Sequence, residues 1–153
     1  MRRKRRVFRI VVLVPTLLVV AVVLWGVLDA FEGADARTVW NYTWPSESGT
    51  ELGGYLVAPE EARRYVTDDD PIRAAPSPDG RLPAVLLLHE WWGLNLETAR
   101  MAETLAADGY VVLAPDLFRG RRSVTVPGAL VQSILAREET VADDVDLAFR
   151  QLA

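Results

Sequence analysis

Two clusters of polar and aromatic residues follow apolar runs in the second half of the chain. The first is HEWWG at residues 89–93, and the second is DLFRGRR at residues 116–122. The apolar runs that precede the two clusters are typical of parallel strands. Ligands bind at the carboxyl ends of such strands in open α/β sheets. Glu90 is the most reactive candidate in the first cluster, because a carboxylate beside a thiol or hydroxyl can accept its proton.

These residues also have structural interpretations. Glu90 would then cap backbone N–H groups at the start of the next helix. We expect His89 to be a structural hydrogen-bonding residue, and Asp116 to cap the turn that follows it. The side chains of Trp91 and Trp92 are expected to pack or to form a pocket wall.

A nucleophile for this chemistry is missing from the sequence. The chain has no cysteine and one histidine, so it offers no thiol nucleophile, disulfide or zinc–thiolate site. The Gly-x-Ser-x-Gly pattern of a nucleophile elbow does not occur at any serine. We expect neither a metal nor a cofactor.

Two strands and a helix must position the clusters. Pro83–His89 (PAVLLLH) is a continuous apolar run, which predicts a strand buried on both faces of a parallel sheet. A helix is expected over Leu96–Ala107, with Asn95 as its N-cap and Gly109 as its stop. The next buried strand is Tyr110–Ala114, which completes a βαβ unit. Five residues are expected on the core face of the helix: Thr98, Met101, Ala102, Leu105 and Ala106.

The preceding segment predicts an antiparallel hairpin at the edge of the sheet. Its strands are Thr38–Trp44 and Thr50–Ala58, and Pro45–Gly49 forms the turn. The polar stretch 59–82 reads as a loop, with one or two helical turns over Glu60–Tyr65.

Two helices are expected after a loop over Leu117–Pro127. They cover Gly128–Ala136 and Glu138–Leu152. The second helix has an apolar stripe that is expected to face the core: Val141, Val145, Phe149 and Leu152.

The N-terminus has the pattern of a membrane segment. Residues 2–9 contain six cations and no acid, and Ile10–Leu28 is uncharged over 19 residues, long enough to span about 28 Å as a helix. We expect a basic cytoplasmic tail over 1–9, a single-pass anchor over 10–28 and a polar tether over 29–37, with the rest of the chain outside the cell. The alternative is a signal peptide cleaved near Ala34-Asp35-Ala36, which would secrete the domain.

The charge beyond the tail argues against nucleic-acid binding. Removing the six N-terminal cations from 17 Lys+Arg leaves 11 against 21 Asp+Glu, a balance of −10. Binding to phosphates needs a basic face, so we expect no nucleic-acid partner.

The segment Leu82–Gly120 resembles the dienelactone hydrolase family. The resemblance rests on His-Glu at a strand end, an aromatic pair, Gly-Leu-Asn, a helix, Asp-Gly-Tyr and Ala-Pro-Asp-Leu-Phe, in that order. GGYLVAP at 53–59 and VADDVDLAFRQLA at 141–153 resemble further family elements. The resemblance implies the N-terminal half of an α/β-hydrolase sheet, consisting of the hairpin and the βαβ unit, behind one transmembrane helix.

The resemblance also implies site roles and a substrate class. Family members hydrolyse small esters and lactones through a Cys or Ser nucleophile with His and Asp. Glu90 matches the glutamate that controls protonation of the nucleophile, and the Trp91 backbone N–H matches an oxyanion donor. Arg119 and Arg121 are both candidates to hold a substrate carboxylate, and Trp92 is a candidate pocket residue.

Residues 38–153 are therefore expected to form an incomplete α/β-hydrolase domain that lacks the nucleophile elbow and the catalytic Asp and His. One interpretation is an ester or lactone hydrolase whose remaining part is lost from this sequence. The other is a non-catalytic, membrane-tethered interaction module. Ala153 falls at a predicted helix end just before an expected strand, which favours the first.

Overall fold

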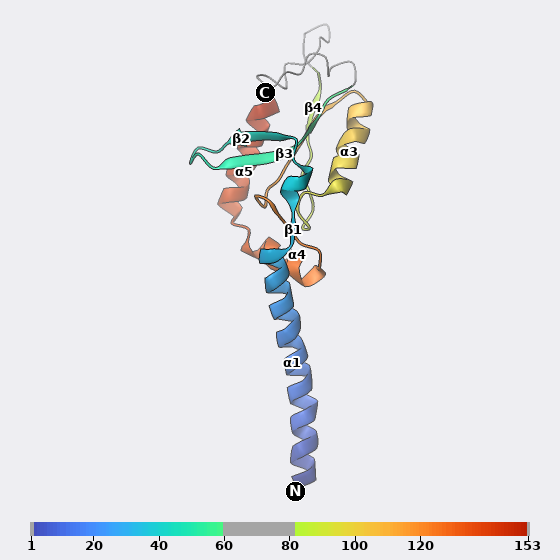
Figure 1. Ribbon diagram of the computed structural model, residues 1–153, viewed down its shortest axis with the longest axis vertical. Coiled ribbons are helices and arrows are strands. Elements are labelled where there is room, and N and C mark those ends of the chain that lie inside the picture. Colours follow the sequence, from blue (N-terminus) through green and yellow to red (C-terminus); the bar gives the residue numbers. More distant parts are fainter. Residues whose placement is uncertain (1, 60–81, 153) are drawn as a thin grey trace.

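The computed structural model describes residues 2–59 and 82–152, with side chains from Val12 onward. It joins a long N-terminal helix to a small α/β domain (Figure 1). The elements in chain order are α1 (Arg2–Glu32), β1 (Ala34–Asp35), the 3₁₀ turn η1 (Ala36–Val39), β2 (Tyr42–Pro45), β3 (Glu51–Val57), β4 (Ala84–Leu86), α3 (Leu96–Ala107), β5 (Val111–Pro115), β6 (Arg121–Arg122), α4 (Val126–Leu135) and α5 (Glu138–Leu152).

The main sheet has four strands in the order β2-β3-β5-β4. β2 and β3 form the expected antiparallel hairpin, β3 pairs antiparallel with β5, and β4 pairs parallel with β5. Every residue of β5 is buried, as expected for a strand with neighbours on both sides and helices on both faces. The mixed α/β architecture predicted from the sequence is confirmed.

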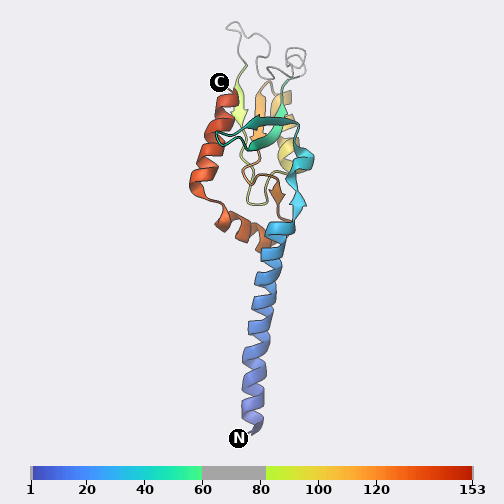
Figure 2. The ribbon, with the colours of Figure 1, turned by 60° about the vertical axis from the view of Figure 1, so that its left-hand side comes forward.

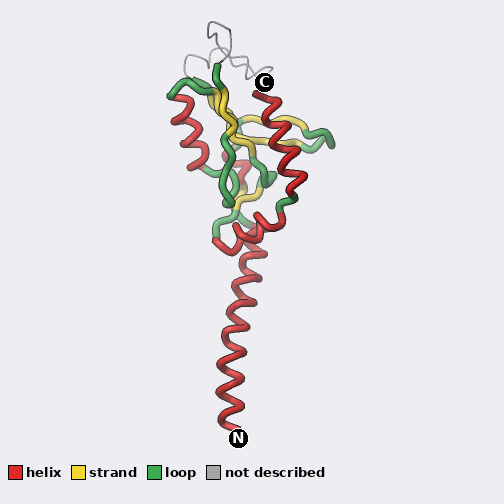
Figure 3. The backbone as a smooth tube through the Cα atoms, turned by 180° about the vertical axis from the view of Figure 1, so that it is seen from behind, coloured by secondary structure: helices red, strands yellow, loops and turns green. Residues whose placement is uncertain are grey.

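Helices α3 and α5 cover opposite faces of the sheet, as the front and rear views show (Figures 1 and 3). Val112 of β5 packs with Ala102 and Ala106 of α3, whereas the next residue, Leu113, packs with Ala148 of α5. Successive strand side chains point to opposite faces, so this alternation places one apolar cluster on each side of the sheet.

The predicted bounds of α3 and α5 are confirmed, and so is the Asn95 cap. Its Oδ1 accepts the N–H groups of Glu97 and Thr98, at 2.9 and 3.1 Å. Gly109 follows α3 with φ +100°, where glycine has no Cβ penalty.

The predicted core faces of these two helices are partly wrong. In α3, Met101 is exposed and Ala99 is buried, because the closest approach to the sheet is made by three alanines: Ala99, Ala102 and Ala106. In α5, Phe149 is exposed and the buried residues are Asp144 and Ala148. The buried face of α5 thus includes Asp144, which forms an ion pair described below.

Two strand predictions need correction. The first half of Thr38–Trp44 is not a strand, because η1 turns the chain there and β2 starts only at Tyr42. The run Pro83–His89 keeps three strand residues, and they are half-buried or exposed rather than fully buried. Within the described chain β4 pairs only with β5. The expected helical turns over Glu60–Tyr65 lie outside the described residues.

Residues 29–37 differ from the polar tether we expected. α1 continues to Glu32, β1 then pairs antiparallel with β6, and Ala30 and Ala36 are buried. The turned view shows α1 running directly into this pairing and lying against α4 (Figure 2). The local composition is polar, but these contacts come from residues about 90 positions away, which local patterns do not reveal.

Among the described residues, one helix is long and apolar enough to cross a membrane. It is the Val12–Glu32 part of α1, and almost all of it is exposed. A signal sequence near the N-terminus can meet the same criteria of length and composition.

Candidate active site

The loop after β4 is anchored by His89, whose ring is buried. Its Nδ1 lies 2.8 Å from the Glu90 carbonyl, and its Nε2 accepts the Leu117 N–H at 3.0 Å. A carbonyl needs a donor and an N–H needs an acceptor, so the ring is the neutral Nδ1–H tautomer. Burial lowers the pKa of His89, which favours the same form. The 4.0 Å contact with Asp116 is therefore not an ion pair.

Asp116 organises the loop after β5. Its carboxylate accepts the N–H of Phe118 at 3.0 Å, the N–H of Gly120 at 2.6 Å and the indole N–H of Trp40 at 3.0 Å. Burial raises the pKa of this carboxyl, while the hydrogen bonds oppose that rise. Asp116 caps the turn, as expected, and His89 is structural. The two loops are held together through the Leu117 N–H.

Residues 90–93 form a tight turn at the carboxyl end of β4. The Gly93 N–H donates to the Glu90 carbonyl at 3.1 Å, and Gly93 has φ +89°. A Cβ at this position would lie 2.7 Å from the Arg121 carbonyl oxygen, so only glycine fits between the two loops. The Trp92 carbonyl accepts the Ser123 N–H at 3.0 Å, which adds a second tie.

Trp91 lies at the top of this turn. Its carbonyl accepts a hydrogen bond from Gln132 Nε2 of α4 at 3.4 Å. The residue is 41% exposed, and its ring makes an edge-to-face contact with Trp92. Within the described chain, nothing accepts a hydrogen bond from the Trp91 N–H or pairs with the Glu90 carboxylate. The turn that carries these two groups is held by hydrogen bonds from Ser123 and Gln132.

The two candidate arginines point to different places. Arg119 has φ +55°, and its Nε and Nη2 each donate to the Asp144 carboxylate at 2.9 Å. This bidentate pair raises the pKa of Arg119. Arg121 instead donates weakly to the Phe118 carbonyl and lies 6.0 Å from the Phe31 ring centroid of α1.

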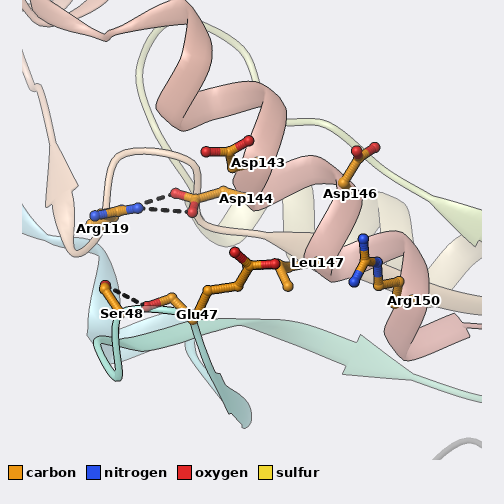
Figure 4. A pocket seen from close by; sticks show the side chains of 9 residues that line it. Glu47, Ser48, Arg119, Asp143, Asp144, Asp146, Leu147 and Arg150 are labelled. Atoms are coloured by element: carbon orange, nitrogen blue, oxygen red, sulfur yellow. Dashed lines mark hydrogen bonds and ion pairs between the residues drawn. The ribbon is translucent and has the colours of Figure 1, made fainter.

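A cleft of about 300 Å³ lies beside the Arg119–Asp144 pair, between the β2–β3 turn and α5 (Figure 4). Four of its nine lining residues are acidic, and none of the described residues around it belongs to the 89–93 turn. Glu90 and Trp91 are consecutive residues of one turn. Arg119 lies at a different place, because it lines this cleft. The charged lining residues are Glu47, Arg119, Asp143, Asp144, Asp146 and Arg150.

Sequence analysis missed Trp40, Gln132 and the buried role of Asp144. Asp144 could have been found, because it lies four residues before Ala148 and eight before Leu152, on a stripe that faces the sheet. Trp40 and Gln132 reach the loops from distant elements, and no local spacing indicates those contacts.

The fold resembles that of a solved structure. A Klebsiella pneumoniae structure described as a "Putative Dienelactone Hydrolase" superposes with a TM-score of 0.52 at 22% identity, covering 71% of this chain and 42% of that one. This likeness concerns the fold alone. The fold is that of part of an α/β-hydrolase.

The family follows from the sequence matches. The dienelactone hydrolase family model matches residues 72–152, which is 81 of 153 positions. The chain belongs to the dienelactone hydrolase family.

Two curated relatives show how much of such proteins the chain represents. An Aquifex aeolicus protein named "Putative carboxymethylenebutenolidase" is 45% identical over 78 residues, covering 49% of this chain and 26% of the relative. The Escherichia coli "Putative hydrolase fragment YghX" is 36% identical over 87 residues, covering 56% of this chain and 61% of the relative. The chain thus spans between about a quarter and three fifths of these relatives.

Proposed function

We propose that this chain provides the oxyanion-donor side of a membrane-anchored hydrolase that acts on small esters or lactones. The observation that supports this most is the Trp91 N–H, which has no acceptor in the described chain although its turn is fixed on both sides. A preorganised backbone N–H stabilises the charge that develops on the carbonyl oxygen during acyl transfer.

Glu90 supplies the second role. Its carboxylate is next to the Trp91 N–H in sequence, is exposed, and has no partner among the described residues. It can accept a proton from a nucleophile that approaches the turn, whether Ser or Cys. The nucleophile, its histidine and its aspartate would come from polypeptide beyond these residues, because the Gly-x-Ser-x-Gly pattern is absent here.

Substrate binding is assigned to the residues around this turn. Trp92 would form part of the pocket wall, and Arg121 or Arg119 would hold a substrate carboxylate. Arg121 is the better placed, because both Nε and Nη2 of Arg119 already donate to Asp144. The reaction would use neither metal nor cofactor.

The domain would be held at the cell surface by α1. Residues 10–28 would span the membrane, with the basic N-terminus in the cytoplasm and the domain outside. The length and apolar character of Val12–Glu32 support this assignment, and a cleaved signal would instead release the domain.

One observation favours a second function, a non-catalytic interaction module. Within the described chain the outer side of β4 has no partner strand, and its residues are apolar. A partner protein could add a strand there.

The test of catalysis compares two substitutions in the whole product of the gene, with an aryl acetate as substrate. Trp91→Phe keeps the N–H and should change kcat by no more than a few-fold, whereas Trp91→Pro removes it and should lower kcat by about 10²–10³. Circular dichroism of both variants controls for folding. Equal activity of the two variants would exclude the oxyanion role.

The same assay distinguishes the two functions. Residues 1–153 alone should hydrolyse nothing above the buffer rate, and Glu90→Gln in the whole product should change the pH profile of kcat. Turnover by residues 1–153 would contradict the proposal that the nucleophile lies elsewhere. A folded whole product without esterase or lactonase activity would favour the interaction module.

A further inference from the structure

Helix α4 has its apolar face on the outside. Val126, Leu130 and Ile134, spaced four residues apart, are all more than half exposed, and Ile134 reaches 72%. The opposite face, which includes Gly128 and Gln132, is buried. A surface helix of a soluble domain has the reverse arrangement, with its apolar stripe toward the core.

The N-terminal end of α4 packs against the end of α1. Pro127 packs against Gly26, where an added Cβ would lie 2.7 Å from the proline Cβ, and Gly128 packs against Asp29. The Asp29 carboxylate accepts the Thr125 N–H at 3.1 Å and the Thr125 hydroxyl at 2.8 Å. Figures 1 and 2 show α4 crossing the last turns of α1, at its junction with the domain. If α1 spans a bilayer, α4 lies at the height where it emerges.

The sequence around α4 is locally basic, although the Asp29 carboxylate packs against the N-terminal end of α4 and Arg137 lies 3.6 Å from Glu139. Residues 117–137 contain four arginines and no acid, whereas residues 29–153 together have a balance of −10. Arg121 and Arg137, which precede and follow α4 in the sequence, are both exposed. Cations flanking an apolar stripe suit the boundary between anionic headgroups and acyl chains.

We propose that α4 lies in the outer headgroup layer of the bilayer that α1 spans, with Val126, Leu130 and Ile134 directed into the lipid. This inference rests on the proposed anchoring by α1. Because Gln132 on the inner face of α4 donates to the Trp91 carbonyl, the 89–93 turn would lie within about one helix diameter, roughly 10 Å, of the lipid surface.

The absence of cysteine makes site-specific labelling of the full chain straightforward. Single cysteines at Leu130 and Ile134 of α4, at Val20 of α1 and at Ala107, an exposed position at the end of α3, would each carry an environment-sensitive fluorophore. The proteins are reconstituted in vesicles of phosphatidylcholine and phosphatidylglycerol that contain lipids with a nitroxide quencher at shallow or deep positions. Circular dichroism checks that each variant is folded.

We expect a blue-shifted emission at Leu130 and Ile134 with about two-fold quenching by the shallow nitroxide, and no quenching at Ala107. Water-like emission at both α4 positions would overturn the inference. Blue-shifted emission without nitroxide quenching would also overturn it, because protein would then cover this face. Val20 reports on the anchor separately: quenching by the deep nitroxide there supports the span, and its absence would defeat the anchoring proposal itself.

Discussion

At the residue scale, the protonation state of His89 controls how the two loops are joined. Protonation would turn Nε2 into a donor that faces the Leu117 N–H, so the charged ring is disfavoured in the folded state. Above pH 6.5, the ordinary pKa of histidine, both the folded and unfolded states are neutral at this site. Below it the unfolded chain binds the proton first, and stability falls.

We therefore expect wild-type stability to decrease between pH 7 and 5.5, by at most about 1.4 kcal/mol per pH unit from His89. His89→Asn keeps one donor and one acceptor without titrating, so it should lack this component. The raised pKa of Asp116 opposes this trend, because the folded state binds the proton first as the pH falls toward 3.8, the ordinary pKa of an aspartate. Thermal unfolding of both proteins across this range is the measurement. A difference between them that does not vary with pH would contradict the neutral tautomer.

Gly93 and Gly109 form a matched pair of positions with positive φ. Alanine at either one should cost about 1 kcal/mol for the left-handed backbone. Gly109 has open space around it, whereas a Cβ at Gly93 would lie 2.7 Å from the Arg121 carbonyl oxygen. We expect Gly93→Ala to cost about 1–3 kcal/mol more than Gly109→Ala in urea unfolding, because it pushes the two loops apart. Equal losses would show that the loops are not in tight contact.

At the scale of elements, the Arg119–Asp144 pair joins the loop after β5 to α5. Arg119→Met would leave the buried Asp144 carboxylate without its two donors. The expected loss in the free energy of unfolding is about 2 kcal/mol. It is below that of a fully buried pair, because the Arg119 side chain is 38% exposed. Arg121→Met is the control, with an expected loss within about 0.5 kcal/mol. Chemical unfolding that ranks the two variants in the reverse order would refute this structural role.

Local signals predicted the elements well and their tertiary contacts poorly. The ends of α3 are encoded by Asn95 and Gly109 at its two boundaries, so its range could be predicted to the residue. The inward position of Asp144 on α5 follows from its helical spacing, but its partner, an arginine 25 positions away, could not be predicted from local patterns. The pairing of β1 with β6 joins two-residue strands nearly 90 positions apart, too short for any periodicity.

The candidate site shows the same division. Residues 89–93 could be singled out because they follow an apolar run, and the family resemblance supplied the roles proposed for Glu90 and Trp91. The contacts that hold the turn come from Ser123 and Gln132, and sequence spacing gave no indication of them.

At the scale of the whole molecule, the orientation of the anchor can be tested by labelling. Ser48 lies in the exposed β2–β3 turn, and Lys4 belongs to the N-terminal basic cluster. Ser48→Cys should react with a membrane-impermeant maleimide in intact cells, whereas Lys4→Cys should react only after lysis. Intact mass of the product distinguishes a retained anchor from a cleaved signal. Labelling of Lys4→Cys alone in intact cells would reverse the proposed topology.

The most direct test of the central proposal is to sequence the transcript and the genomic DNA through codon 153 and beyond. We predict a continuation, in frame or after a frameshift, that encodes a strand followed by Gly-x-Ser-x-Gly or Gly-x-Cys-x-Gly. Such a continuation would complete the hydrolase around Glu90 and Trp91. A verified stop after Ala153 with no elbow downstream would contradict the catalytic roles of both residues and leave the interaction module as the function.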